Sequence, residues 1–228
     1  MTYVFDPGEP PSVEIKGEQK RFAVRRIYCV GRNYAAHVKE MGFDAEREPP
    51  FFFTKPADAV VANGAPVPYP QRTDNLHHEI ELVVAIGRAG RDVSPSGARE
   101  LIYGYAVGND LTRRDLQLAA RDKGRPWDVG KAFDHSAPVT AIHPVESVGH
   151  IERGRIWLSV NGELRQEADV ADMIWNVPEI VAELSSLFAL APGDLIFTGT
   201  PAGVGRLQRG DRIEGGVGDM DRLVTTIV

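Results

Sequence analysis

The apolar run at residues 82–86 limits the fold more than any other stretch of the sequence. Two carboxylates, Glu79 and Glu81, precede it, so the strand predicted over residues 79–86 begins charged and becomes wholly apolar. Alternate residues of a strand point to the same face, which makes the two glutamates neighbours. Like charges on one face of a mostly buried strand are costly without compensation. We expect either a divalent cation beside them or a strand end exposed to water.

The rest of the chain also favours strands. Glycine (23 residues) and proline (16 residues) are spread along the sequence, as in proteins with many short strands and turns. Further strands are predicted at residues 26–30, 102–107, 156–160, 195–198, 212–214 and 222–228. They do not alternate regularly with helices, which disfavours a doubly wound parallel sheet. We therefore predict a β-rich α+β fold, a mixed roll or sandwich with a few peripheral helices.

Local signals mark several element ends. Thr112, followed three residues later by Asp115, is typical of a helix start and predicts a helix that runs to about residue 123. Asn176 with Pro178 predicts the start of a second helix. Asn161-Gly162 predicts a hairpin turn after the strand at 156–160.

Length and charge exclude several classes of protein. With 228 residues the chain suits one large domain, or one domain with a small appendage, and we divide it into an N-terminal arm or small hairpin (1–25) and a main domain (26–228). The net charge of −6 opposes nucleic-acid binding. The basic side chains at positions 113–125 are then interpreted as a solvated helix face: Arg113, Arg114, Arg121, Lys123 and Arg125.

The sequence also indicates where in the cell the protein is found. No apolar run has the length of a membrane span, and the N-terminus lacks the basic and apolar regions of a signal peptide. The single cysteine, Cys29, excludes an internal disulfide and lies in an apolar run, where we expect a buried strand residue. We expect a cytoplasmic protein that binds neither membranes nor nucleic acids.

A third carboxylate strengthens the prediction of a metal. Asp110 follows the apolar strand predicted at 102–107, at a Gly-Asn-Asp corner from which a carboxylate can enter a pocket. An Asx turn or helix cap is the alternative at this position. Three carboxylates without a thiolate favour Mg²⁺, Mn²⁺ or Ca²⁺ over zinc.

Seven segments, in order along residues 26–228, resemble the fumarylacetoacetate hydrolase family in its compact acylpyruvate hydrolase form. They are VGRNYAAH (30–37), FTKP (53–56), NLHHEIEL (75–82), DLTRRDLQ (110–117), GKAFD (130–134), VNGE (160–163) and TGTPAGVG (198–205). Each segment alone is weak evidence, whereas the ordered set is specific.

The resemblance implies a β-roll fold, a homodimer, and a Mg²⁺ or Mn²⁺ ion that Ca²⁺ could replace in crystals. It also implies roles for residues of this chain. The implied metal ligands are Glu79, Glu81 and Asp110, the catalytic residues are His37, Glu40 and Lys131, and the substrate-binding residues are Arg32, Gln117 and Thr200.

The implied reaction is hydrolysis of a carbon–carbon bond in a 2,4-dioxo acid. The segments between residues 32 and 55 resemble bacterial enzymes of aromatic catabolism that cleave fumarylpyruvate to fumarate and pyruvate. Alternatives on the same scaffold are oxaloacetate decarboxylation or tautomerisation and isomerisation of 2-hydroxyhepta-2,4-diene-1,7-dioate. An alternative from another class is a non-catalytic β-barrel binding module, in which the three carboxylates would be scattered and solvated.

Overall fold

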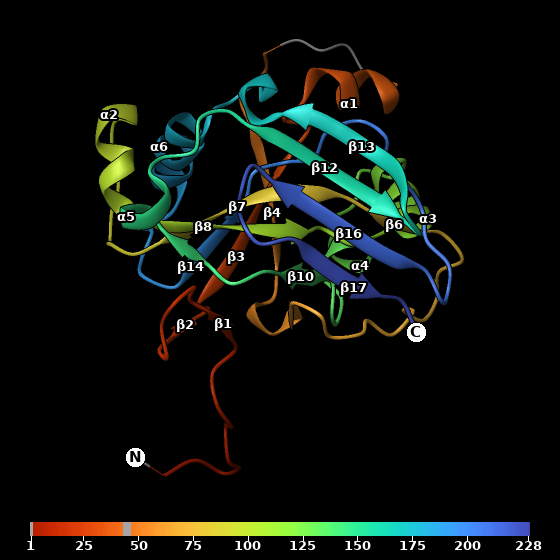
Figure 1. Ribbon diagram of the computed structural model, residues 1–228, viewed down its shortest axis with the longest axis horizontal. Coiled ribbons are helices and arrows are strands. Elements are labelled where there is room, and N and C mark those ends of the chain that lie inside the picture. The colour runs from red at the N-terminus through yellow and green to blue at the C-terminus, as the bar shows by residue number, and fades with distance from the viewer. Residues whose placement is uncertain (1, 43–46) are drawn as a thin grey trace.

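The computed structural model describes residues 2–42 and 47–228 and has a strand-rich body with helices at its edges (Figure 1). Within these residues the larger sheet contains eight strands and runs β4-β3-β14-β7-β8-β10-β5, with β11 paired to β8. Its strands are β3 (Arg26–Gly31), β4 (Phe51–Lys55), β5 (Val60–Ala62), β7 (Ile80–Ile86), β8 (Ile102–Asn109), β10 (Ala137–Val139), β11 (His143–Pro144) and β14 (Asp194–Phe197).

The remaining strands form smaller sheets. The order β13-β12-β16-β17 describes the second sheet, made of β12 (Arg155–Val160), β13 (Glu163–Asp169), β16 (Arg212–Val217) and β17 (Leu223–Thr226). A third sheet joins β6 (Leu76–His78), β9 (Thr112–Arg113) and β15 (Gly205–Arg206). An N-terminal hairpin pairs β1 (Ser12–Glu14) with β2 (Arg21–Ala23).

Helices are short and lie at the periphery. The α-helices are α1 (Ala35–Glu40), α2 (Pro95–Ala98), α3 (Arg114–Arg121), α4 (Asp128–Lys131), α5 (Val145–Val148) and α6 (Val177–Leu187). The 3₁₀ helices are η1 (Ala57–Ala59), η2 (Arg99–Leu101) and η3 (Val170–Asp172). None of these described helices has the length and apolar composition needed to cross a membrane. The observed architecture confirms the predicted β-rich class.

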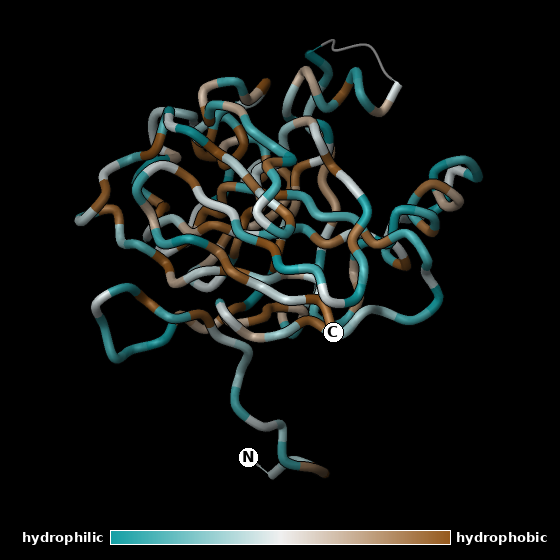
Figure 2. Tube along the Cα trace, turned by 45° about the vertical axis from the view of Figure 1, so that its right-hand side comes forward, coloured by the Kyte–Doolittle hydropathy of each residue, from teal (hydrophilic) through white to brown (hydrophobic). Residues whose placement is uncertain are grey.

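Strand β7 is apolar from Leu82 to Ile86 because both of its faces are covered there. Leu82, Val84 and Ile86 point into a core shared with the second sheet, whereas Val83 and Ala85 point into a core on the opposite face. All of these side chains are buried. The apolar segments accordingly concentrate inside the body (Figure 2). Burial on two sides removes the need for the alternating pattern of a half-exposed strand.

Several local predictions are confirmed. Asn176 caps α6 in a reciprocal hydrogen-bonding arrangement with Glu179. Asn161 and Gly162 join β12 to β13 with positive φ angles of 54° and 84°, the conformation that such a hairpin turn requires. Cys29 is buried in β3.

Two local predictions are wrong. Glu79 lies between β6 and β7 rather than inside one continuous strand. Thr112 belongs to β9, and α3 begins at Arg114 with Arg113 as its N-cap. The Thr112 hydroxyl instead donates a hydrogen bond to the carbonyl of Asp110. A hydroxyl that satisfies the preceding backbone in this way competes with helix capping.

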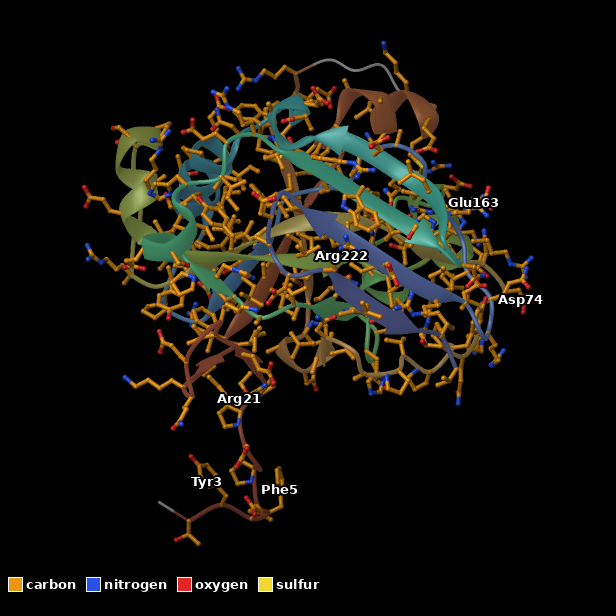
Figure 3. The ribbon with its side chains drawn as sticks, viewed as in Figure 1. Tyr3, Phe5, Arg21, Asp74, Glu163 and Arg222 are labelled. Atoms are coloured by element: carbon orange, nitrogen blue, oxygen red, sulfur yellow. The ribbon has the colours of Figure 1, made fainter. Side chains whose placement is uncertain are left out.

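The N-terminal segment leaves the body. The β1–β2 hairpin packs against the larger sheet through Val13 and Phe22, and the chain before it projects outward, with Tyr3 and Phe5 on the projecting part (Figure 3). The division into a unit at 1–25 and a domain at 26–228 stays a prediction.

Replacement of Asn176 should destabilise the protein through α6. Asn176→Ala removes the oxygen that accepts from the Glu179 backbone N–H, so the free energy of unfolding should fall by about 1 kcal/mol. The melting temperature should fall by about 2–4 °C for that change in a chain of this size. Asn176→Asp keeps an acceptor oxygen and serves as the control. Equal melting temperatures for the wild type and Asn176→Ala would contradict this role.

Candidate metal centre and active site

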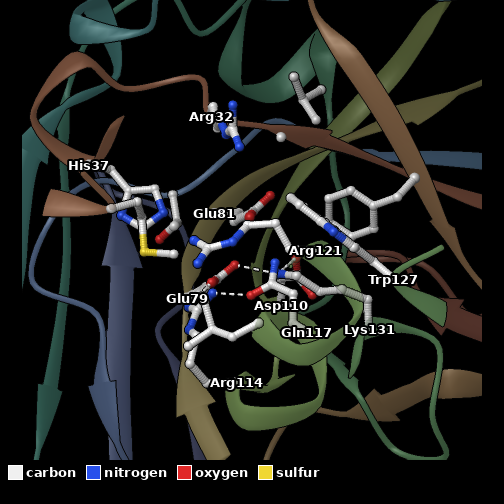
Figure 4. A pocket seen from close by; sticks show the side chains of 16 residues that line it. Arg32, His37, Glu79, Glu81, Asp110, Arg114, Gln117, Arg121, Trp127 and Lys131 are labelled. Carbon is white, nitrogen blue, oxygen red and sulfur yellow. Dashed lines mark hydrogen bonds and ion pairs between the residues drawn. The ribbon is translucent and has the colours of Figure 1, made fainter. Parts of the chain in front are cut away.

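Three buried carboxylates meet where β7 and β8 pair. Glu79 precedes β7, Glu81 lies on it, and Asp110 directly follows β8. The backbone N–H of Asp110 donates to the carbonyl of Glu79 over 2.8 Å, and the side chain of Asn109 accepts from the N–H of Glu79 over 2.8 Å. One oxygen from each carboxylate lies within 4.8 Å of the others. Figure 4 shows them in one pocket.

Three cations compensate these carboxylates. Lys131, at the end of α4, lies with its Nζ 2.6 Å from oxygens of both Glu79 and Asp110 (Figure 4). The Lys55 Nζ, from β4, is 2.8 Å from the other oxygen of Asp110. The guanidinium of Arg114, from the first turn of α3, pairs with Glu79. All three cations are buried, so each carboxylate that they contact is neutralised without help from water.

The carboxylates differ in their proton affinity. Burial alone would raise the pKa of Glu79, but the charges of Lys131 and Arg114 hold it well below its usual range. Burial, followed by the charges of Asp110 and Glu79, raises the pKa of Glu81 well above its ordinary value, against a 2.8 Å hydrogen bond from the Gly199 backbone N–H. Glu81 is therefore the carboxylate that most lacks a positive partner.

This donor set fits a hard divalent cation. Carboxylate oxygens are the ligands that Mg²⁺ and Mn²⁺ prefer, and a cation among them would supply the charge that Glu81 lacks. The alternative of a solvated strand end is wrong, since Glu79, Glu81 and Asp110 are at most 4% exposed. Their burial in one cluster also contradicts the scattered, solvated carboxylates expected of a binding module.

A histidine–glutamate pair borders the same pocket. His37 lies on α1 and is nearly buried, and its Nδ1 is 3.0 Å from Oε2 of Glu40. The backbone N–H of Gly203 donates to both oxygens of that carboxylate. Burial acts to raise the pKa of Glu40, but its hydrogen bonds with His37 and Gly203 hold it below the usual value. An ionised Glu40 can therefore orient the imidazole and stabilise its protonated form.

The three residues expected at the substrate also line this pocket: Arg32, Gln117 and Thr200. Gln117 accepts a hydrogen bond from Arg114. Thr200 is held by buried Gln166, whose amide donates to the Thr200 hydroxyl over 2.8 Å.

Several of these contacts lie beyond the sequence predictions. Arg114, interpreted as part of a solvated helix face, is only 4% exposed and belongs to the site. Lys55 was contained in the FTKP segment, and its motif could have identified it. Gln166 is signalled by no local pattern, yet its side-chain oxygen accepts from the Ile80 backbone and from His78.

Comparison with known proteins shows which family the chain belongs to. Residues 26–228 match the fumarylacetoacetate (FAA) hydrolase C-terminal family, and the chain belongs to that family. Fumarylpyruvate hydrolase of Ralstonia sp. is 51% identical over 184 residues, covering 81% of this chain and 95% of the relative. The mitochondrial oxaloacetate tautomerase of Bos taurus is 45% identical over 193 residues, covering 85% of this chain and 87% of the relative.

One similar solved structure contains a metal ion and a small ligand. The crystal structure of fumarylpyruvate hydrolase from Pseudomonas aeruginosa, in complex with Mn²⁺ and pyruvate, superposes with a TM-score of 0.97 at 53% identity. The match covers 100% of this chain and 99% of that one.

Metal binding should depend on Glu81. When Mn²⁺ exceeds its Kd about a hundredfold, the melting temperature of the wild type should rise by about 5–10 °C. Glu81→Gln should remove most of this rise yet fold without metal, because its surroundings already disfavour a charge at this position. The exposed Glu163 supplies the control, Glu163→Gln. A Mn²⁺ response in Glu81→Gln equal to that of the wild type would argue against the site.

Proposed function

We propose that this protein is a metal-dependent hydrolase that cleaves the C3–C4 bond of fumarylpyruvate to give fumarate and pyruvate. The observation that carries the proposal is the placement of a histidine–glutamate pair, a buried lysine and a buried carboxylate cluster around one pocket. The similarity to fumarylpyruvate hydrolases over most of the chain supports the choice of substrate.

In this proposal the carboxylates Glu79, Glu81 and Asp110 would hold Mg²⁺ or Mn²⁺. The ion supplies Lewis-acid stabilisation of negative charge on a substrate oxygen. Lys131 adds a fixed positive charge beside the same carboxylates, and its ammonium stabilises the negative charge that develops on the departing pyruvate unit. Burial strengthens this effect because little water screens the charge.

His37 is the proposed general base. With its Nδ1–H donating to Glu40, the Nε2 atom carries the lone pair that can accept a proton from water. That water attacks the C4 carbonyl, the C3–C4 bond breaks, and its electron pair passes to the pyruvate unit. A proton then adds at C3, which yields pyruvate, while the acyl part leaves as fumarate. Glu40 stabilises the imidazolium between these two proton transfers.

The proposed roles of Gln117, Thr200 and Arg32 are to bind and orient the substrate. Gln117 and Thr200 present an amide and a hydroxyl to the pocket, and both are held by hydrogen bonds to buried side chains. Fixed polar groups of this kind orient a substrate without losing much conformational freedom on binding.

The reaction is tested directly with fumarylpyruvate. Metal-stripped protein should be inactive, and added Mg²⁺ or Mn²⁺ should restore the release of pyruvate and fumarate. His37→Ala should lower kcat by about 10²–10⁴-fold while its Mn²⁺-dependent gain in melting temperature stays unchanged. His135→Asn is the control, because His135 is exposed and has a positive φ that asparagine tolerates.

Oxaloacetate should be assayed beside fumarylpyruvate, because the mitochondrial tautomerase relative favours it as a second candidate substrate. Release of CO₂ or rapid tautomerisation of oxaloacetate, with little cleavage of fumarylpyruvate, would overturn the hydrolase proposal. Isomerisation of 2-hydroxyhepta-2,4-diene-1,7-dioate would do the same.

We further propose a cytoplasmic homodimer. The apolar side chains Tyr3, Val4 and Phe5 are 63%, 101% and 78% exposed on the projecting N-terminal segment, and exposed apolar clusters are typical of contact surfaces. Light scattering should give twice the chain mass of 25.0 kDa. A mass of one chain at micromolar concentration would contradict the dimer. The single buried cysteine supports the cytoplasmic assignment.

A further inference from the structure

The pocket carries a second charged group besides the metal site. Arg32, just after β3, and Arg121, at the end of α3, line the same pocket as the three carboxylates. Burial lowers the pKa of Arg32; the charge of Glu48 acts to raise it and the charge of Arg121 to lower it further. The two guanidiniums therefore repel each other across the pocket. Figure 4 shows Arg32 set apart from the cluster of Glu79, Asp110 and Lys131.

The position of Arg32 is fixed by the backbone. Its φ of 58° lies in the left-handed region, which residues other than glycine rarely adopt. The neighbouring Asn33 holds it there. The Asn33 amide donates to the carbonyls of Trp175 and Thr198 over 2.9 and 2.8 Å, and its oxygen accepts from the Trp175 N–H over 2.8 Å. Strain that is maintained by buried hydrogen bonds is typical of functional positions.

Apolar side chains also line the pocket. Phe53 and Trp127 line the pocket and contact each other, with ring centroids 5.7 Å apart. Val30 and Leu118 add aliphatic surface. The pocket thus combines a metal-binding carboxylate cluster, an apolar wall and a pair of arginines. A ligand that matches all three has an anionic chelating group, an apolar part and a second anionic group.

We propose that Arg32 and Arg121 bind the distal carboxylate of the acyl group, and that Arg121 selects diacid substrates over monoacid ones. This subsite rests on the proposed function, because it assigns the end of the substrate that the metal does not bind. A carboxylate placed between two guanidiniums removes their repulsion and accepts charge-assisted hydrogen bonds. Arg121 also pairs with Asp122 in this structure, at 2.9 Å, so ligand binding would add to or exchange that contact.

Turnover of two acylpyruvates tests the selection. Fumarylpyruvate has the distal carboxylate and acetylpyruvate lacks it. Arg121→Gln should lower kcat/KM for fumarylpyruvate by about 10–100-fold and change that for acetylpyruvate by less than about threefold. Arg121→Lys should recover part of the loss. Lys123→Gln removes the same charge from an exposed position two residues away, and it controls for the change in net charge.

A binding measurement separates this subsite from the chemistry. Calorimetry on Mn²⁺-loaded protein would compare fumarate with crotonate, in which a methyl group replaces one carboxylate. The wild type should bind fumarate about tenfold more tightly or better, and both Arg121→Gln and Arg32→Asn should reduce this preference to about threefold or less. Asparagine is chosen at position 32 because it tolerates the left-handed backbone.

The two proposals fail differently. If fumarate is preferred in an Arg121-dependent way but fumarylpyruvate is not cleaved, the subsite stands and the proposed reaction is wrong. Equal binding of fumarate and crotonate by the wild type, or equal losses with both acylpyruvates in Arg121→Gln, would overturn the subsite even if fumarylpyruvate is hydrolysed.

Discussion

The structure depends on the pairing of buried carboxylates with buried cations in one pocket. Glu79, Glu81 and Asp110 are buried among Lys55, Lys131 and Arg114, so elements that are distant in the sequence must come together for any of these groups to be tolerated. Removal of one partner from a buried ion pair costs about 3–5 kcal/mol, because the other charge stays desolvated. The contacts tie β4, β7, β8, α3 and α4 to one point.

Much of the fold could be predicted from the sequence because its signals are local. The apolar run at residues 82–86 indicated a mostly buried strand, and β7 does lie between two cores. Asn161-Gly162 and Asn176 act within three residues of themselves, so their turn and helix cap followed from chain geometry alone. The carboxylate cluster was predicted by a similar local argument. Glu79 and Glu81 are two residues apart, and two like charges on one face of a buried strand are costly unless a cation compensates them.

The features that the sequence did not predict depend mainly on contacts between residues that are distant in the chain. Arg114 was interpreted as solvated because a basic helix usually faces water, and only the fold brings it against Glu79. Gln166 makes its hydrogen bonds with residues more than 30 positions away. The helix start predicted at Thr112 was wrong because this residue belongs to β9 and its hydroxyl donates to the carbonyl of Asp110. No pattern in the sequence indicates this hydrogen bond.

The mixture of charges at the carboxylate cluster has a thermodynamic consequence. A divalent cation brings two further positive charges to a place that already holds Lys55, Lys131 and Arg114, so the loaded pocket attracts anions more strongly than the metal-free one. Linkage is reciprocal. An anionic ligand must therefore increase the affinity for the ion by the same factor by which the ion increases the affinity for that ligand. A protein of this kind can hold its metal loosely between turnovers and firmly during each one.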